Sequence, residues 1–402
     1  MLSRRQLLKF SGLGLMAAGI PGVTFAGAET DSRLVLVILR GAVDGLAMLA
    51  PYGEPSYAGL RGELALQAPG NPGGLLKLDG LFGLHPSLTN IHSMYQQQQA
   101  TLFHAVASPY RERSHFDAQN LLENGTLKAG GTRDGWLNRA LSSINNANSQ
   151  TGKKYTAIAM AQNTPLVLRG PQPVSSWAPS SLPGADEETL SRIKRLYSND
   201  EFFAERLQQA LESQEIAGNQ QSSRRRNRQK QAREKMQVTA KFLRADNGPR
   251  IAVMESGGWD THANQGAANG SLANKFEALD TSLGEFRNAM GDDWSSTVVI
   301  LVTEFGRTVR VNGTRGTDHG TAGAAMLLGG AVNGGKIHTD WPGLQAANLY
   351  QGRDLMPTTD LRSVFKGVLA DHLSVAKRKL DNEVFPDSID TPAIKDLCTA
   401  RT

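Results

Sequence analysis

The sequence predicts an α/β fold built on a mainly parallel central sheet with helices packed against it. The first observation is the run LVLVIL at residues 34–39, a continuous apolar stretch typical of a strand buried on both faces. The second is that similar short apolar runs recur and alternate with helix-forming segments. The third is composition: 402 residues, of which 40% are hydrophobic and 20% charged, suit a large globular core and exclude a disordered chain.

The first residues predict an export signal. Arg4 and Arg5 lie ahead of a weakly apolar stretch at residues 10–25, and Ala26-Gly27-Ala28 matches an A-x-A cleavage signal. We expect a twin-arginine signal peptide at residues 1–28, the twin-arginine export machinery as a partner, and a periplasmic or extracellular mature chain. A membrane anchor is the alternative, but the apolar run is short and Pro21 interrupts it. No stable membrane span is therefore expected after cleavage.

The mature chain, residues 29–402, is predicted to form one α/β domain. The predicted strands are residues 34–39, 101–107, 155–160, 250–255 and 297–302, and a closing helix ends near His372. From about residue 161 to 249 the strand and helix alternation stops, because residues 171–183 are rich in Pro and Ser and residues 187–244 are largely helix-forming. This segment is predicted to be a helical insertion over the core.

Charge and cysteine content narrow the classes of partner and site. The net charge is +5, and residues 1–28 contribute Arg4, Arg5 and Lys9, so the mature chain carries 5 − 3 = +2. Residues 222–235 contain seven basic residues and one acidic residue. With no aromatic residue among them to stack bases, they favour a solvated helix face, and a nucleic-acid partner is not expected. The one cysteine, Cys398, excludes a disulfide framework and a cysteine-based zinc site.

The strongest candidate for a functional site lies at residues 296–330. The apolar run at residues 297–302 ends in a polar cluster that holds Glu304 and Arg307, and a glycine-rich loop then brings Asp318-His319 before a second apolar run. We interpret this as two buried strands whose C-terminal edges present these four side chains to one cleft. Ligands of open α/β sheets usually bind at such an edge.

Two other predicted strands also end in polar side chains. Asp260 and His262 follow a Gly-Gly loop after residues 250–255, and a carboxylate and an imidazole at this spacing can reach one divalent cation. The alternative is an Asx-type helix cap with a hydrogen-bonded histidine. Asp44 lies in the loop after the first strand, close to Arg40.

Ser114 has two interpretations. Ser114-x-x-Asp117 ahead of a helix-forming segment is a helix N-terminus signature in which the serine caps the first turn. A hydroxyl at that position also faces free backbone N–H groups, which suits a nucleophile or an anion contact. Arg111, Arg113 and His115 add cations there that a cap does not need.

The motifs together resemble a known family. LRGAVDGL, RSHFDAQ, GGWDTH, TEFGRT, TDHGTAGAAMLLGG and RDLMPTTDLRSVF occur in this order behind the twin-arginine signal, as in domain of unknown function family 1501. That family of exported bacterial proteins resembles the alkaline phosphatase and sulfatase superfamily. The resemblance covers essentially the whole mature chain, and it implies a three-layer α/β sandwich with up to two divalent metals at the C-terminal ends of strands.

The resemblance also implies roles for particular residues. Asp44 would be the first-strand metal ligand and Ser114 the nucleophile. Asp260 with His262 would form the Asp-His pair of one metal site, and His319 its late histidine, with Asp318 beside it. Glu304 would belong to the second site, although Phe305 stands where a histidine ligand is expected. The metal would be zinc, calcium or manganese. Arg113 and Arg307 would bind the anionic group of the substrate through paired hydrogen bonds.

These expectations lead to two functions of different classes. The first is a metal-dependent hydrolase of phosphate or sulfate esters, with an anionic ester as substrate. The second is a catalytically degenerate protein of the same fold that binds or assembles an unknown envelope partner. The first predicts bound metal and ester hydrolysis, and the second predicts neither. A third interpretation, polyanion binding by residues 224–235, predicts a steep salt dependence.

Overall fold

The computed structural model describes residues 31–147, 157–179, 228–246 and 248–399, together with the single positions 195, 200, 207 and 216. The predicted signal peptide at residues 1–28 and most of the predicted helical insertion lie outside the described residues. The compact unit considered below is Asp31–Thr402. Within its described ranges, no helix is both long enough and apolar enough to cross a bilayer.

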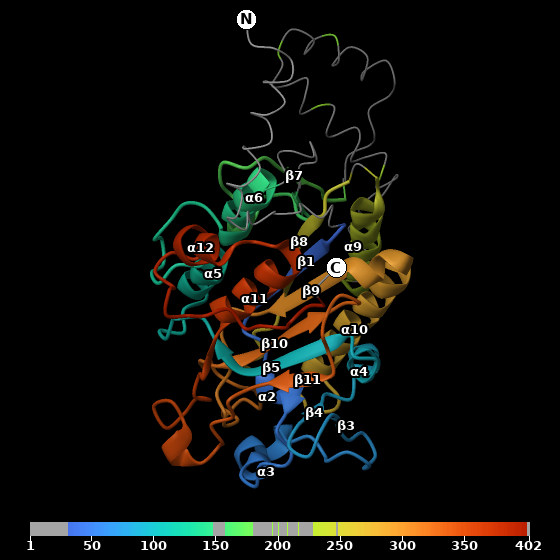
Figure 1. The fold of residues 1–402 in the computed structure, drawn as a ribbon. Helices are drawn as coiled ribbons and strands as arrows, with labels where there is room; N and C mark the ends of the chain where they lie inside the picture. Colours follow the sequence, from blue (N-terminus) through green and yellow to red (C-terminus); the bar gives the residue numbers. More distant parts are fainter. Residues whose placement is uncertain are drawn as a thin grey trace, which may run out of the picture. The chain divides into compact units, whose positions relative to one another are not determined.

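A single large sheet forms the centre of this unit (Figure 1). Its order is β11-β5-β10-β9-β1-β8-β6-β7, and β12 pairs with β5. Among the described strands, β10 runs antiparallel to β5 and β9, and the other neighbours pair in parallel. The strands of this sheet are β1 (Arg33–Arg40), β5 (Ala100–Ala107), β6 (Ala157–Ala159), β7 (Val174–Ser176), β8 (Ile251–Gly257), β9 (Thr297–Val302), β10 (Gly323–Leu328), β11 (Lys336–His338) and β12 (Thr359–Asp360). The predicted α/β class with a mainly parallel sheet is confirmed.

Helices cover both faces of the sheet, which gives the three predicted layers. The α-helices are α2 (Gly45–Met48), α3 (Tyr57–Arg61), α4 (Thr89–Gln96), α5 (His115–Asn124), α6 (Trp136–Ala147), α9 (Arg228–Arg244), α10 (Ser271–Met290), α11 (Leu361–Leu373) and α12 (Lys377–Lys379). The 3-10 turns are η1 (Gly62–Leu64), η2 (Leu166–Leu168), η3 (Gly291–Ser296) and η4 (Ala346–Asn348), and η5 (Leu380–Val384) is a π-helix turn. A small separate sheet has the order β2 (Leu49–Ala50), β4 (Gly83–Leu84) and β3 (Leu76–Lys77).

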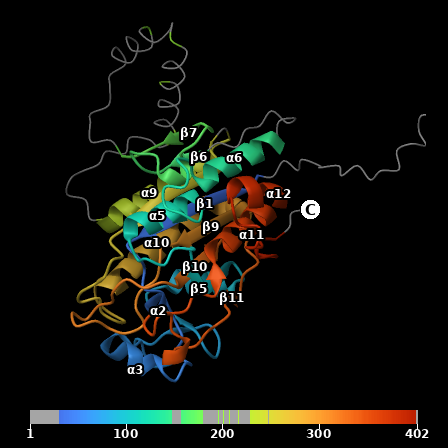
Figure 2. The same cartoon turned by 90° about the vertical axis from the view of Figure 1, so that its left-hand side faces the viewer.

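The alternation of side chains along β1 shows why this strand is apolar throughout. Leu34, Leu36 and Ile38 point into a core shared with α6 and α11, whereas the residues between them point into a second core shared with α4, α9 and α10. Figure 2 views the first of these layers from outside, with α5, α6 and α11 in front of the sheet. A strand buried on both faces has no solvent side on which to place polar residues. Polar side chains that could form a site are therefore expected after its C-terminal end.

The direction of β10 differs from the expectation. The sequence predicted that two strands present their C-terminal edges to the cleft, but Asp318 and His319 precede β10 and so lie at its N-terminal end. Because β10 runs antiparallel to β9, its N-terminal end meets the C-terminal end of β9 at the same edge of the sheet. The predicted meeting point is unchanged, and the prediction of the strand direction was wrong.

The described parts of the predicted insertion contain both sheet and helix. Residues 157–179 hold β6 and β7, which extend the sheet beyond β8, and α9 packs along α10. Arg233 on α9 forms an ion pair with Glu285 on α10, and Lys230 beside it is exposed, as a solvated basic face requires. The boundaries of the insertion stay a prediction.

Two buried histidines make the stability of the fold sensitive to acid. His104 on β5 is fully buried, accepts a hydrogen bond from the Ala105 amide and donates to the Leu49 carbonyl. Burial lowers the pKa of His104 to about 4, and burial likewise lowers the pKa of His85 to about 4. Each histidine therefore contributes stability that is fully present above pH 6.5 and is lost as the pH falls from 6.5 to 4, because the unfolded chain takes up the proton first.

Replacing His104 with glutamine is expected to reduce this acid sensitivity. The free energy of unfolding of the variant should fall by about 2 kcal/mol less than that of the wild-type chain between pH 6.5 and pH 5. Urea unfolding curves for both proteins at the two pH values measure the difference. The contributions of other titrating groups to the change in stability are the same in both proteins and cancel in the comparison. An equal loss in the two proteins would contradict the assignment of a buried neutral imidazole at position 104.

Candidate metal centre

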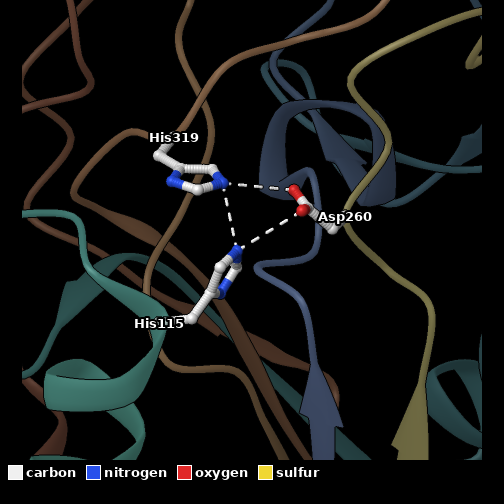
Figure 3. A group of neighbouring side chains, drawn as sticks. All are labelled: His115, Asp260 and His319. Atoms are coloured by element: carbon white, nitrogen blue, oxygen red, sulfur yellow. Dashed lines mark hydrogen bonds and ion pairs between the residues drawn. The ribbon is translucent and has the colours of Figure 1, made fainter.

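Three side chains from distant parts of the chain converge at the edge of the sheet (Figure 3). His115 is the first residue of α5, Asp260 follows β8, and His319 lies in the loop between β9 and β10. The Nε2 atoms of His115 and His319 are 3.0 Å apart. One oxygen of the Asp260 carboxylate is 3.2 Å from the His319 Nε2 atom, and the other is 3.5 Å from the His115 Nε2 atom.

His262 adds a fourth side chain to this group. Its Nε2 atom is 3.0 Å from the Asp260 Oδ1 atom and 3.0 Å from the His319 Nε2 atom. The side chains of Asp260 and His262 are 39% and 43% exposed, so solvent reaches one side of the group. Asp260, His262 and His319 were predicted to act together as ligands, and the structure brings them together.

The hydrogen bonds behind each imidazole fix the position of its proton. His115 Nδ1 lies 2.8 Å from a Glu304 carboxylate oxygen, His319 Nδ1 lies 3.0 Å from the Arg113 carbonyl oxygen, and His262 Nδ1 lies 3.2 Å from an Asp318 carboxylate oxygen. Carboxylate and carbonyl oxygens only accept hydrogen bonds, so each Nδ1 must carry the proton. All three Nε2 atoms are then left with a lone pair, and those of His115 and His319 lie within 4.8 Å of each other and of an Asp260 carboxylate oxygen.

This arrangement fits a bound divalent metal. Lone pairs on three nitrogens and a carboxylate repel one another at about 3 Å unless a proton or a cation lies between them. Tetrahedral coordination with bonds of about 2.0 to 2.1 Å places neighbouring ligand atoms about 3.3 Å apart, which is close to the spacing seen here. Histidine ligands whose second nitrogen is held by a carboxylate or a carbonyl are the usual arrangement around such metals.

Glu304 supports the group from behind. It is fully buried and accepts hydrogen bonds from His115, from Gln119 Nε2 at 3.0 Å and from the Gly41 amide at 2.8 Å. Burial alone would raise the pKa of Glu304, but these hydrogen bonds outweigh it and lower the pKa to about 2. Gly41 has a φ of +117°, and a Cβ at this position would lie 2.6 Å from the Asp260 amide nitrogen. The close passage of the two loops therefore requires glycine here.

The structure assigns Glu304 and Asp318 to positioning histidines. The Glu304 carboxylate accepts from His115, and one oxygen of Asp318 contacts both His262 and the Asn312 amide, so the role of these two carboxylates as metal ligands stays a prediction. Phe305, at the position where a histidine ligand was expected, stacks on the His115 imidazole with ring centroids 4.9 Å apart. Within the described residues, one group of side chains has the spacing of a metal site.

Arg307 is a buried partner of Asp260. Its Nη1 donates to Asp260 Oδ1 at 2.6 Å and its Nε donates to Thr317 Oγ1 at 3.2 Å, and the side chain has no exposed area. Burial would raise the pKa of Asp260, but the hydrogen bond and the charge of Arg307 lower it. Arg307 thus holds Asp260, while its Nη2 atom has no hydrogen-bond partner among the described residues, and the predicted contact with an anionic ligand stays a prediction.

Asp44 lies in a different network. Its carboxylate caps α2 by accepting from the Ala47 amide at 3.2 Å, forms an ion pair with Arg61 and accepts from Gln265 Nε2 at 2.7 Å. Asp44 and Arg61 are both almost completely buried. Asp44 is not part of the group formed by His115, Asp260 and His319, and its role as a metal ligand stays a prediction.

Arg113 and Ser114 directly precede His115, and their predicted roles as anion contact and nucleophile stay predictions. Ser114 is at the N-cap position of α5, yet its side chain makes no capping hydrogen bond, so that expectation was wrong. The Arg113 side chain donates to Asp354 at 2.8 Å and to Gln351 at 2.7 Å, and its backbone carbonyl holds His319. Arg113 has a φ of +62°, which is a strained conformation for a residue with a side chain.

His115 was not predicted as a ligand. The sequence placed it among the cations near Ser114, and its position as the first residue of a helix gave no signal that its ring faces Asp260 and His319. Hydrogen bonding to Glu304 raises the pKa of His115, whereas burial and the neighbouring His115 charge lower the pKa of His319.

Comparison with known proteins identifies a family and several solved structures. Residues 31–384 match the family described as "Protein of unknown function (DUF1501)". The search of curated proteins found no match. The chain resembles the C-terminal periplasmic domain of EcEptC from Escherichia coli in complex with zinc, at 10% identity over 89% of this chain and 87% of that chain, with a TM-score of 0.39.

Two hydrolase structures are similar at the same level. The phosphonate monoester hydrolase of Agrobacterium radiobacter has 12% identity over 86% of this chain and 74% of that chain, with a TM-score of 0.36. The PsFucS1 sulfatase from Pseudoalteromonas sp. has 11% identity over 92% of this chain and 74% of that chain, with a TM-score of 0.38. At these TM-scores, the matches carry no information on the chemistry of this chain, which has to come from its own side chains.

Proposed function

We propose that this chain, which belongs to the DUF1501 family, is a metal-dependent hydrolase of phosphate or sulfate esters. The observation that carries the proposal is that His115, Asp260 and His319 place ligand atoms within 4.8 Å of one another, with the His262 Nε2 atom 3.0 Å from both Asp260 and His319. A site with this geometry binds a divalent cation, and the exposed side of Asp260 and His262 leaves it open to a substrate.

The residues that would hold the metal are His115, Asp260, His262 and His319. Three nitrogens and one oxygen suit zinc or manganese better than calcium, which prefers six to eight oxygen ligands. When bound, such a metal polarises an ester oxygen and lowers the pKa of a coordinated hydroxyl group or water.

The surrounding residues keep the ligands in position before a substrate arrives. Glu304, Asp318 and the Arg113 carbonyl each hold one imidazole, so the rings need no reorientation. Arg307 holds the Asp260 carboxylate and compensates its charge. The strained backbone at Arg113 places its carbonyl against His319, and strain of this kind is often found at functional sites.

The N-terminus of α5 supplies the remaining features of a hydrolase site. Its first backbone N–H groups have no acceptor within the helix, and the Ser114 side chain does not cap them. An anionic ester group near His115 would be attracted by these N–H groups and by the positive end of the helix dipole. The Ser114 hydroxyl, one residue before the ligand His115, is the candidate nucleophile.

We also propose that the chain acts outside the cytoplasm, after export by the twin-arginine machinery. The support is the pair Arg4-Arg5 and the cleavage signal Ala26-Gly27-Ala28. A substrate of this protein would then be an anionic ester of the periplasm or the exterior.

Hydrolysis assays on the mature chain test the proposed function. Protein loaded with zinc or manganese is expected to hydrolyse at least one of p-nitrophenyl phosphate, bis-p-nitrophenyl phosphate and p-nitrocatechol sulfate. Activity should disappear on treatment with a chelator and return when the metal is restored. Stoichiometric metal without hydrolysis of any of the three esters would favour the binding or assembly function, and failure to bind metal would remove the basis of the proposal.

A further inference from the structure

A second candidate site lies between α9, α10 and the C-terminal end of β8. It is a pocket of about 500 Å³, and none of its lining residues belongs to the metal centre. Pockets of this size accommodate small organic ligands.

One wall of the pocket is apolar. It is formed by Met236 on α9, Met254 on β8, Trp259 after β8 and Leu279 on α10. The Trp259 ring is fixed by a hydrogen bond from its Nε1 to Ser256 Oγ at 3.3 Å and by packing against Phe276. Methionine side chains adapt to alkyl and aromatic groups, so this wall suits an apolar body of either kind.

The charged groups of the pocket are positive on balance. Lys235 and Lys275 line it together with one acidic residue, Glu255, whose carboxylate is already bonded to Arg40 at 2.5 Å. The Lys275 Nζ atom lies against the loop after β8, 2.9 Å from where a Cβ of residue 258 would be. The charge inside the pocket therefore favours an anion and disfavours a cation.

Lys235 is the charged group of the pocket that an anionic ligand would stabilise most. Its side chain is half-buried, and its ammonium group makes no hydrogen bond or ion pair with any residue in the described part of the chain. Burial lowers the pKa of Lys235 in spite of the nearby Glu255 charge. A partly desolvated ammonium without a partner is stabilised when an anion binds beside it.

We propose that this pocket binds an anionic amphiphile with a phosphate, sulfate or carboxylate head and a short alkyl or aryl body. The head pairs with Lys235 and Lys275, and the body packs on Met236, Met254 and Trp259. The arginine-rich segment at residues 224–228 carries the same sign of charge as the pocket, so this part of the chain does not suit it as an occupant.

Calorimetric titration of the purified chain with octyl phosphate tests the proposal. The chain is first freed of metal with a chelator, so that the metal centre does not bind the phosphate ester. We expect saturable binding of one molecule per chain, with inorganic phosphate and octyltrimethylammonium each at least tenfold weaker. Lys235→Met should weaken octyl phosphate binding at least tenfold, because it keeps the length of the side chain and removes its charge. Ala278→Phe, which places a ring in the pocket from α10, should abolish binding.

Two control variants separate this site from other causes. Lys241→Met removes an exposed charge from the same helix and should leave the affinity unchanged. His319→Ala should also leave it unchanged, so the result does not depend on the metal centre or on ester hydrolysis. The proposal is overturned if octyl phosphate does not bind, if octyltrimethylammonium binds as tightly, or if Lys241→Met weakens binding as much as Lys235→Met does.

Discussion

Replacing His319 with alanine is expected to abolish stoichiometric binding of zinc or manganese and the metal-dependent ester hydrolysis with it. His319 Nε2 is the atom closest to all the other ligands, 3.0 Å from the Nε2 atoms of His115 and His262 and 3.2 Å from Asp260. Its loss removes one of four ligands from the centre of the group. We expect metal affinity to fall more than 100-fold, because loss of a supporting residue behind a ligand already costs about 10- to 100-fold.

The hydrolytic rate should fall about 1000-fold or more, which corresponds to roughly 4 kcal/mol of transition-state stabilisation. Elemental analysis of the purified variant gives the metal content, and the assays with nitrophenyl and nitrocatechol esters give the rate. The matched control is His92→Ala, which removes a histidine from α4 whose ring Nε2 pairs with the Lys77 carbonyl, outside the metal centre. Its metal content should equal that of the wild-type chain.

A milder replacement, at Glu304, tests whether the carboxylate that accepts a hydrogen bond from His115 contributes to metal affinity. Glu304→Gln keeps the shape of the side chain but removes the charge that His115 and Gln119 point at. Metal affinity is expected to fall by about 10- to 100-fold, less than in His319→Ala. Unchanged metal content in His319→Ala, or an equal loss in His92→Ala, would refute the assignment of the centre.

The sequence predicts well the features that depend on consecutive residues only. The strand at residues 297–302 is confirmed with its predicted ends, because Thr297 and the five apolar residues that follow it have few other conformations in a core. Asp260 and His262 were predicted as a pair because both follow the same strand end. Local patterns of this kind need no knowledge of the rest of the fold.

The direction of β10 depends on distant residues, so it cannot be predicted from the sequence of the strand itself. Its partners are β5, more than two hundred residues earlier, and β9. An apolar strand has the same composition in either direction, so only the pairing decides whether Asp318 and His319 lie at its start or its end. The prediction of a shared edge was right because antiparallel pairing returns the start of β10 to that edge.

The roles of the charged residues were the hardest to predict. Arg307 was expected to bind an anion because arginine pairs with oxyanions through two hydrogen bonds, and its burial and its contact with Asp260 could not be predicted because both depend on other segments. His115 was missed for the opposite reason. The helix signature at Ser114 and Asp117 accounts for the segment without giving its histidine a function.

The double replacement of Asp44 and Arg61 is expected to destabilise the fold less than the two single replacements do in sum. The Arg61 side chain is fully buried, and its charge is balanced by Asp44, with further hydrogen bonds to the Thr308 and Val309 carbonyls. Asp44→Ala leaves this guanidinium without its carboxylate, and Arg61→Met leaves a buried carboxylate without its cation. Each single change should lower the free energy of unfolding by about 3 to 5 kcal/mol, the range measured when one partner of a buried pair is removed.

The Asp44→Ala/Arg61→Met double variant contains neither charge, so its loss of stability should be smaller than the sum of the single losses by 1 kcal/mol or more, as estimated for coupled neighbours. Urea unfolding of the four proteins at pH 7 measures this coupling, and additive losses would show that the two charges do not stabilise each other. The same proteins decide between the two roles of Asp44. A metal ligand would lose metal on replacement, as His319→Ala should, whereas a structural partner of Arg61 loses stability and keeps its metal. We expect the second result, because the Asp44 carboxylate is held by Arg61, Gln265 and the Ala47 amide, and none of these contacts belongs to the metal centre.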